Sequence, residues 1–265
     1  MSATASAAEL LATVERSPQA VAVHDRAAWV GLFTRDALVE DPVGSRPHRG
    51  TAAIERFYDT FIAPNGIAFR VGHDVVCGMT VYRDLAIETT MSTGVTLRVP
   101  MHLRYDLTRT GGELRIRELH AHWELPVMVG QLLLSGGPGL LAAARLAPQL
   151  LGNQGIGGAL GFARGFRRVG AAAKRTATTF LRSAARGDSS ARAALTPDAA
   201  LLWCGAPLGV EGFLRQATGL RPETPIAAGR FITTTISTPT ARGIAELELT
   251  RNSRQIKAAR IYLGE

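Results

Sequence analysis

Asp41 is a candidate general base, because it follows the short strand-like segment 37–40 and opens the turn Asp-Pro-Val-Gly. A carboxylate held in an apolar pocket is poorly solvated, so its pKa rises and it accepts protons more readily near neutral pH. The chemistry that such a group performs is proton transfer at a carbon atom beside a carbonyl group. This chemistry depends on a pocket, and the surrounding elements must build it.

Other residues could bind metal or nucleotide. His120, His122 and Glu124 alternate along one segment and would share one face of a strand, which is a spacing that metal sites use. Trp123 is the residue expected to face the pocket, so these three side chains should point outward to solvent or to a subunit. The adjacent His73 and Asp74 are typical of surface polar residues. The sequence has no glycine-rich nucleotide loop and no Gly-x-Ser-x-Gly motif. We therefore expect no metal and no cofactor.

The first half of the chain has the pattern of helices followed by antiparallel strands. Two helices are expected within 7–33, with Ser17 capping the second and Pro18 in its first turn, and a third helix over 51–61. Glycines 111 and 112 mark a hairpin. The segments rich in β-branched and aromatic residues are 68–76, 80–91, 96–107 and 114–125. This order predicts an α+β fold with the helices on one face of a curved antiparallel sheet.

The middle of the chain is apolar and rich in glycine. Residues 125–144 carry no charge, but Gly-Gly-Pro-Gly at 136–139 interrupts the run, and a membrane-spanning helix needs about 20 continuous apolar residues. We expect short amphipathic helices instead. They form either a linker packed on two domains or an element that contacts a membrane surface.

The last third repeats the plan of the first half in shortened form. Helices are expected at 171–185 and 210–217, and strands at 229–236, 243–250 and 256–263. Residues 198–203, Asp-Ala-Ala-Leu-Leu-Trp, resemble residues 36–41, which places Trp203 where Asp41 stands. The second copy therefore lacks the acid–base group. We predict domains at 1–128 and 171–265, joined by an amphipathic helical connector at 129–170.

Charge and cysteine content limit the other possibilities. The net charge is +8, and the acid-free stretch between Val127 and Gly187 carries eight basic residues, which equals the whole excess. Charge confined to one connecting segment does not favour nucleic-acid binding. Cys77 and Cys204 form no metal spacing, so we expect two free thiols in a reducing, cytoplasmic compartment. The first residues do not have the pattern of a secretory signal.

The segment VEDPVGSRP at 39–47, continued through 50–58, closely resembles the bacterial steroid Δ5-isomerases within the NTF2-like superfamily. The resemblance covers about half of the chain. It implies a cone-shaped domain in which Asp41 removes a proton from C4 of a 3-oxo-Δ5-steroid and returns it to C6. It also implies that no metal or organic cofactor takes part, since the dienolate is delocalised over the substrate.

The same resemblance assigns further site residues. Tyr58 matches a pocket tyrosine, Phe33 a wall aromatic, and Trp123 an aromatic on the last strand. Two oxyanion donors of the family are not matched. Ser17 stands at the position of the helix tyrosine. The strand acid falls on His102 by direct counting, whereas strand alternation turns Leu103 inward instead. Tyr58, Tyr105 or His102 would then have to stabilise the enolate.

Three functions remain open from the sequence. The first is a cofactor-independent isomerase acting on a steroid-like ketone. The second is a non-catalytic steroid or lipid carrier, and the third is a cyclase or dehydratase of the same fold that uses Asp41 as its base. For partners we expect a small apolar ligand, no nucleic acid, and peripheral membrane contact through residues 129–186. The protein would be either a homodimer or a monomer whose second domain takes the place of a partner subunit.

Overall fold

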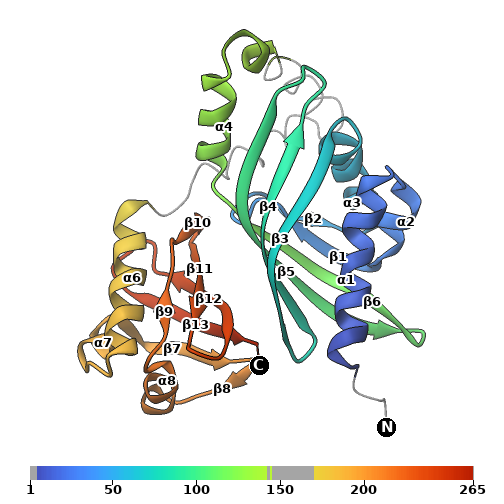
Figure 1. Ribbon diagram of the computed structural model, residues 1–265. Helices are drawn as coiled ribbons and strands as arrows, with labels where there is room; N and C mark the ends of the chain where they lie inside the picture. The colour runs from blue at the N-terminus through green and yellow to red at the C-terminus, as the bar shows by residue number, and fades with distance from the viewer. Residues whose placement is uncertain (1–4, 142–143, 145–169, 265) are drawn as a thin grey trace.

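The computed structural model describes residues 5–141, 144 and 170–264. Figure 1 shows two units, each built from a sheet with helices against one of its faces. The fold class expected from the sequence, two α+β units of the same plan, is confirmed.

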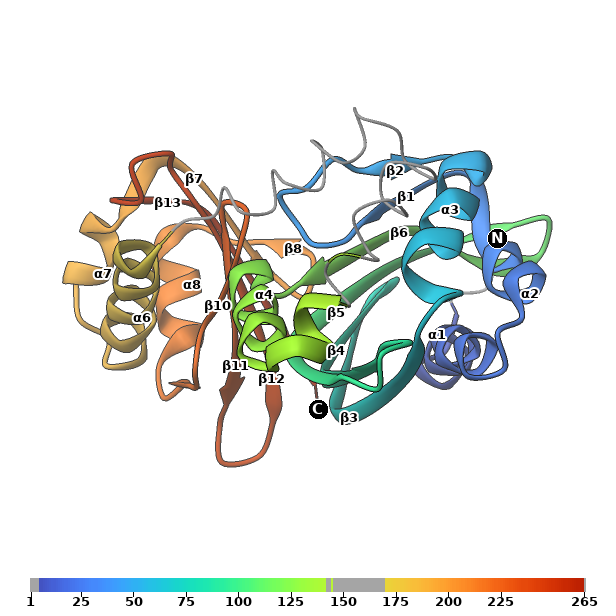
Figure 2. The ribbon, with the colours of Figure 1, turned by 90° about the horizontal axis from the view of Figure 1, so that it is seen from above.

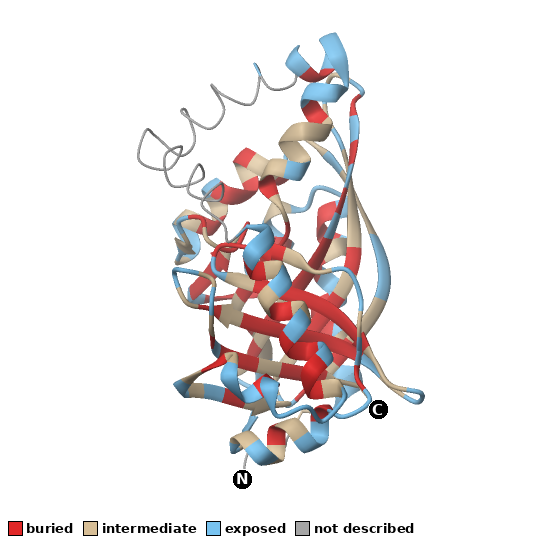
Figure 3. Ribbon diagram, turned by 90° about the vertical axis from the view of Figure 1, so that its left-hand side faces the viewer, coloured by how far each residue is buried: buried red, intermediate tan, exposed pale blue. Residues whose placement is uncertain are grey.

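The first sheet has the order β2-β1-β6-β5-β4-β3, with β1 parallel to β6 and the other neighbours antiparallel. Glycines 111 and 112 form the expected hairpin between the last two strands, both with positive φ. Inward-facing residues of these strands form the core together with the helices, and Figure 3 shows this buried zone along the strands. The strands are β1 (Phe33–Glu40), β2 (His48–Arg49), β3 (Gly66–Cys77), β4 (Thr80–Thr90), β5 (Thr96–Thr110) and β6 (Glu113–His122).

Helices cover the concave face of this sheet. They are α1 (Ala7–Ala22), α2 (Arg26–Gly31), α3 (Thr51–Phe57) and the π-helical turn η1 (Tyr58–Ile62) that continues α3. A capping box of Ser6 and Glu9 begins α1. The expectation that Ser17 caps a second helix is wrong, because α1 continues through Pro18 to Ala22. The N-cap of the second helix is Asp25, whose side chain accepts a hydrogen bond from Ala28 N.

The second sheet repeats this topology. Its order is β8-β7-β13-β12-β11-β10, with β7 parallel to β13 and β9 paired to β11. Phe180, Phe213 and Leu201 are among the side chains that fill its core. Its elements are α6 (Ala171–Ala185), α7 (Ser190–Ala193), β7 (Leu195–Trp203), β8 (Ala206–Pro207), α8 (Val210–Ala217), β9 (Arg221–Pro222), β10 (Ile226–Ala228), β11 (Phe231–Ser237), β12 (Arg242–Leu249) and β13 (Ile256–Leu263).

The open faces of the two sheets pack against each other, as Figure 2 shows from above. Glu246 on β12 is fully buried in this interface and pairs with Arg104 of the first sheet at 2.8 Å and Arg260 of its own sheet at 2.9 Å. Tyr82 donates a hydrogen bond to the same carboxylate. Burial opposes ionisation of Glu246, but the two arginines and His122 outweigh it and hold the pKa of this carboxyl below its usual range.

A disulfide joins Cys77 at the end of β3 to Cys204 just after β7, with 4.9 Å between the two Cα atoms. The expectation of two free thiols is therefore wrong. The sequence spacing of 127 residues hid the pairing, because only the packing of one sheet on the other brings the two positions together. The free-thiol argument for a reducing compartment is lost with it.

The apolar helix α4 (Leu125–Leu134) crosses the expected boundary at residue 128 and packs on β5. Residues 142–143 and 145–169, which make up most of the expected connector, lie outside the described residues. Among the helices that are described, none has the length and apolar character needed to cross a bilayer.

Candidate active site

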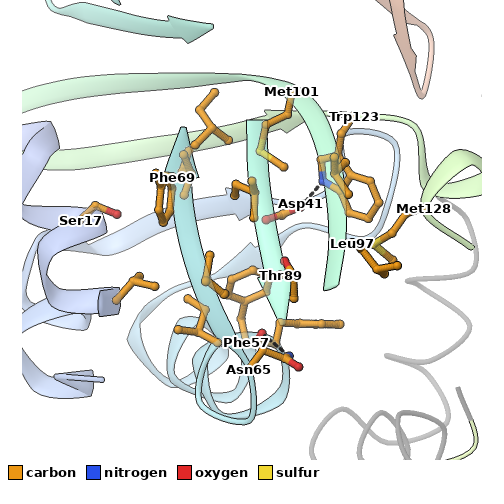
Figure 4. Close-up of a pocket in the computed structure, with 18 of the residues that line it drawn as sticks. Ser17, Asp41, Phe57, Asn65, Phe69, Thr89, Leu97, Met101, Trp123 and Met128 are labelled. Carbon is orange, nitrogen blue, oxygen red and sulfur yellow. Dashed lines mark hydrogen bonds between the residues drawn. The ribbon is translucent and has the colours of Figure 1, made fainter. Parts of the chain in front are cut away.

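A cavity of about 160 Å³ opens between the first sheet and its helices. Its wall is mainly apolar, and Figure 4 shows Ser17 at one end of it and Met128 and Leu97 at the other. Polar atoms are few, so any ligand held here must be largely apolar. The polar wall residues, with the indole of Trp123 included, are Ser17, Asp41, Asn65, Thr89, Tyr105 and Trp123.

The carboxylate of Asp41 lies at the middle of this wall, directly after β1. Trp123 Nε1 donates a hydrogen bond of 2.6 Å to Asp41 Oδ1. The residue is half-buried and borders the cavity. Burial raises the pKa of Asp41 to about 6, against the lowering effect of the Trp123 hydrogen bond. At pH 7 most of this carboxyl is thus ionised, yet basic enough to take a proton from carbon.

Tyr105 is the second titratable residue of the cavity wall. It lies on β5 and is 1% exposed. Burial raises the pKa of Tyr105 to about 12, although Arg83 and a hydrogen bond with Ser17 act to lower it. Ser17 also accepts a hydrogen bond of 3.1 Å from Trp29 Nε1. The Tyr105 hydroxyl therefore stays protonated at neutral pH and can donate to an oxygen in the cavity.

Arg83, on the inward face of β4, lies close to this end of the cavity without lining it. Two of its guanidinium nitrogens hold Asp74 at 2.7 and 2.9 Å. The third, Nη1, is buried and has no hydrogen-bond partner among the described residues. Arg83 is 3% exposed, so its charge acts on the adjacent tyrosine with little solvent screening.

The structure brings together five of the site residues expected from the sequence. Asp41, Tyr105, Trp123 and Ser17 all line the cavity, and Leu103 lines it as well. Strand alternation predicts that Leu103 faces inward, and Leu103 does line the cavity. Ser17 reaches the cavity because α1 does not break at Pro18, so the serine sits on the inner face of a continuous helix.

Phe33, Tyr58 and His102 are not part of the cavity wall. Phe33 packs on Trp29 inside the core, with ring centroids 4.7 Å apart. Tyr58 is 1% exposed and also packs on Trp29, and its hydroxyl is buried without a hydrogen-bond partner among the described residues. Neither ring is placed to touch a ligand in the cavity.

His102 belongs to the contact between the two sheets. Its Nδ1 lies 2.8 Å from Thr233 Oγ1 and its Nε2 lies 3.2 Å from Thr235 Oγ1. Burial lowers the pKa of His102 to about 4, so the ring is neutral at pH 7. The expectation that His102 lies in the site is wrong, because even-numbered residues of β5 at this point face the second sheet, whereas Met101, Leu103 and Tyr105 face the cavity.

The outward-facing histidines also take structural partners. His120 lies 3.2 Å from Glu40 and 3.0 Å from Glu118, and His122 lies 3.2 Å from the Tyr82 hydroxyl. Ligand atoms of Asp106, Glu118 and His120 lie within 4.8 Å of one another. A guanidinium nitrogen of Arg104 already lies 3.1 Å from Asp106, and this positive charge disfavours a cation there.

Sequence reasoning missed three polar residues of the site. Thr89 and Arg83 stand on the same face of β4 as Ile87, so strand alternation could have placed them inward. Asn65, which donates to Phe61 O at 2.9 Å, follows η1 in a turn and carries no such signal.

Residues 14–125 match the model of the SnoaL-like domain family. That segment is therefore similar to the SnoaL-like domain, a class within the NTF2-like fold. Within this class, the chain is similar to the steroid Δ-isomerase of Nocardioides simplex, with 51% identity over 51 residues. That match covers 19% of this chain and 42% of the relative, so the chain spans about two fifths of its length.

Solved structures of similar proteins cover a little less than half of the chain. A Δ5-3-ketosteroid isomerase from Mycobacterium sp. is 28% identical, covers 44% of this chain and 95% of its own, and superposes with a TM-score of 0.41. The epoxide hydrolase/cyclase-like enzyme SalBIII, described for pyran ring formation in polyether salinomycin, is 23% identical. The match covers 45% of this chain and 93% of the SalBIII chain, with a TM-score of 0.41.

Proposed function

We propose that this protein is a cofactor-independent isomerase that moves the C=C bond of a 3-oxo-Δ5-steroid, or of a similar flat apolar ketone, into conjugation. One observation carries the proposal: a carboxylate, Asp41, faces a largely apolar cavity with its pKa raised to about 6. A base of this strength in an apolar wall suits removal of a proton next to a ketone. The similarity to a steroid Δ-isomerase supports the choice of substrate class.

The reaction is a proton transfer within one molecule of substrate. Ionised Asp41 takes a proton from C4, the C–H electron pair enters the ring system, and negative charge develops on the ketone oxygen. The protonated Asp41 then returns the proton to C6, and the double bond moves from C5=C6 to C4=C5. Atoms and charge balance, and Asp41 ends the cycle ionised.

The developing negative charge on the oxygen needs a hydrogen-bond donor. Tyr105 supplies it in this proposal, because its hydroxyl is the protonated donor of the wall beside Ser17 and near the charge of Arg83. Preorganised donors of this kind contribute about a hundredfold to a thousandfold in rate. Ser17 and Leu103, which stand at the family's donor positions, cannot replace a tyrosine and an acid by themselves.

Conversion of a Δ5-3-ketosteroid to its conjugated Δ4 isomer, followed by ultraviolet absorbance, tests the proposal. Asp41→Asn should lose turnover by at least about a thousandfold while circular dichroism stays unchanged. Asp36→Asn is a matched control, because Asp36 lies on the same strand and is exposed. A wild-type protein that binds the steroid without turnover would reject the isomerase.

A non-catalytic steroid or lipid carrier is the second candidate. The presence of Ser17 and Leu103 at the donor positions favours it, because such a wall holds an apolar ligand without polarising its ketone. A carrier binds the steroid equally well in wild type and in Tyr105→Phe, and shows no turnover in either. A cyclase or dehydratase that uses Asp41 as its base would leave the steroid unchanged and act on another ketone.

For the oligomeric state we propose a monomer. The second sheet covers the open face of the first through Tyr82, His102 and Arg104, so this face is not available to another subunit. Sedimentation equilibrium should give the mass of one chain, 28.2 kDa. A stable mass of twice that value would contradict it.

A further inference from the structure

Helix α4 and the helical residues 136–141 that follow it expose an apolar surface. Seven large apolar residues are exposed among those described, and five of them lie here: Val127, Leu133, Leu134, Leu140 and Leu141. Leu134, the last residue of the helix, is 89% exposed. Contiguous apolar surface of this kind commonly marks a contact site for another protein or for a membrane.

The other side of the same helix closes the cavity. Met128 and Leu132 line the cavity, and Leu132 packs with Val95 and Leu97 at the end where Figure 4 places Met128. One helix therefore contacts the ligand space with one face and presents leucines outward with its opposite face and its end. A ligand that leaves a lipid phase at this helix would have to pass only one layer of side chains to reach the cavity.

Charge distinguishes the kind of surface that this helix fits. Residues 125–144 have no charged side chain, and the chain has no acidic residue between Val127 and Gly187 while it carries eight basic ones. Arg98 lies beside α4, where its main chain pairs with Gln131, and its exposed side chain makes no ion pair with any described residue. Four of the eight basic residues lie outside the described segments, and the surface is defined here without them.

We propose that α4 and residues 136–141 dock the protein on a bilayer that contains anionic phospholipid, with the helix lying in the interface. The exposed leucines enter the acyl boundary, and Arg98 beside the helix faces the phosphate groups. The nature of the ligand that would pass from the lipid into the cavity rests on the proposed function. The docking itself does not, because it depends on the exposed residues of α4 and of 136–141 and not on the cavity.

Co-sedimentation with vesicles tests the docking. The full-length protein should bind vesicles of phosphatidylcholine mixed in equal parts with phosphatidylglycerol, and bind phosphatidylcholine alone more weakly. The double variant Leu133→Asp/Leu134→Asp should lose at least tenfold in binding, because both side chains are exposed on the docking surface. Neither residue lines the cavity, so the variant leaves the ligand site intact. Val23→Asp is the matched control, because Val23 is 74% exposed at the end of α1, and it should bind like wild type.

Three results would overturn the proposal. The first is a wild type that ignores both vesicle types, and the second is an equal loss of binding in Val23→Asp. The third is a concentration-dependent dimer that Leu133→Asp/Leu134→Asp converts to monomer, since the surface would then be a contact between copies. Asp41→Asn should bind vesicles like wild type, and the Leu133/Leu134 variant should keep turnover of steroid in buffer. Vesicle binding thus tests the docking, and steroid turnover tests the isomerase, independently of each other.

Discussion

Trp123 Nε1 donates to Asp41 Oδ1 at 2.6 Å, so the residue that follows β6 holds the carboxylate that follows β1. The parallel pairing of β1 with β6 makes this contact possible, because it brings the carboxyl ends of both strands to the same end of the sheet. The hydrogen bond stabilises the ionised form, whereas burial destabilises it, and burial is the larger effect.

This balance predicts a pH profile. kcat/KM should rise with pH through an acid limb centred near pH 6 and level off above it, because only the ionised carboxylate accepts the proton. Trp123→Phe removes the donor to the charged form, so the limb should move to higher pH by about one unit. The measurement is steady-state turnover of a non-ionising steroid between pH 4 and 9. An unmoved limb in Trp123→Phe would show that another group controls it.

Asp41 should also reduce the stability of the folded protein. Its folded pKa is about 6, whereas the reference value is 3.8, so the folded state binds more protons than the unfolded state between these values. The contribution of Asp41 to the free energy of unfolding is therefore present at low pH and lost as pH rises through about 4 to 6. The free energy of unfolding falls by about 3 kcal/mol at most over this range.

Asp41→Asn should accordingly be more stable than wild type at pH 7, and the difference should vanish near pH 4. Urea unfolding at both pH values measures it. The asparagine keeps an oxygen for Trp123, so the variant tests the buried charge and not the hydrogen bond. A variant less stable than wild type at pH 7 contradicts the assignment of Asp41 to an apolar environment.

Tyr105→Phe should lower kcat about a hundredfold with little change in KM, because the hydroxyl acts on charge that develops in the transition state. Tyr58→Phe is the matched control, since its hydroxyl is buried, has no hydrogen-bond partner among the described residues and does not reach the cavity. That variant should keep its turnover and be at least as stable as wild type. Equal losses in both variants would remove Tyr105 from the mechanism.

The periodicity of the sequence is sufficient to predict most of the fold. Strand alternation along Met101, Leu103 and Tyr105 placed the inward face of β5 correctly, because a one-residue shift would bury every polar neighbour in the cone. The order of helices and strands predicted both sheets. The sequence predicted the helix ends less well. Pro18 suggested a break at residue 17, but α1 continues to Ala22, because Val14 and Val21 on either side of the proline are both buried in the core.

What depends on the packing of the two units was not accessible from the sequence. The partner of His102 is Thr233, 131 residues away, and the partner of Cys77 is 127 residues away. Neither has a local signal. Asp41 lines the cavity as the motif predicts. For His102 the two sequence arguments disagreed, and its position follows the strand alternation and not the direct count.

Glu246 provides a test of how the two sheets are held together. Its carboxylate is fully buried and offsets the charges of Arg104 and Arg260, so Glu246→Ala takes this partner from Arg260 and leaves Arg104 with Asp106 alone. Removing one member of a buried charge cluster commonly costs about 3 to 5 kcal/mol. We expect a loss of this size in the free energy of unfolding, measured with urea at pH 7.

Glu211→Ala is the control, because it removes only the exposed pair with Arg192 and should change stability little. Similar effects of both variants would mean that water reaches Glu246 and that the two sheets do not exclude it.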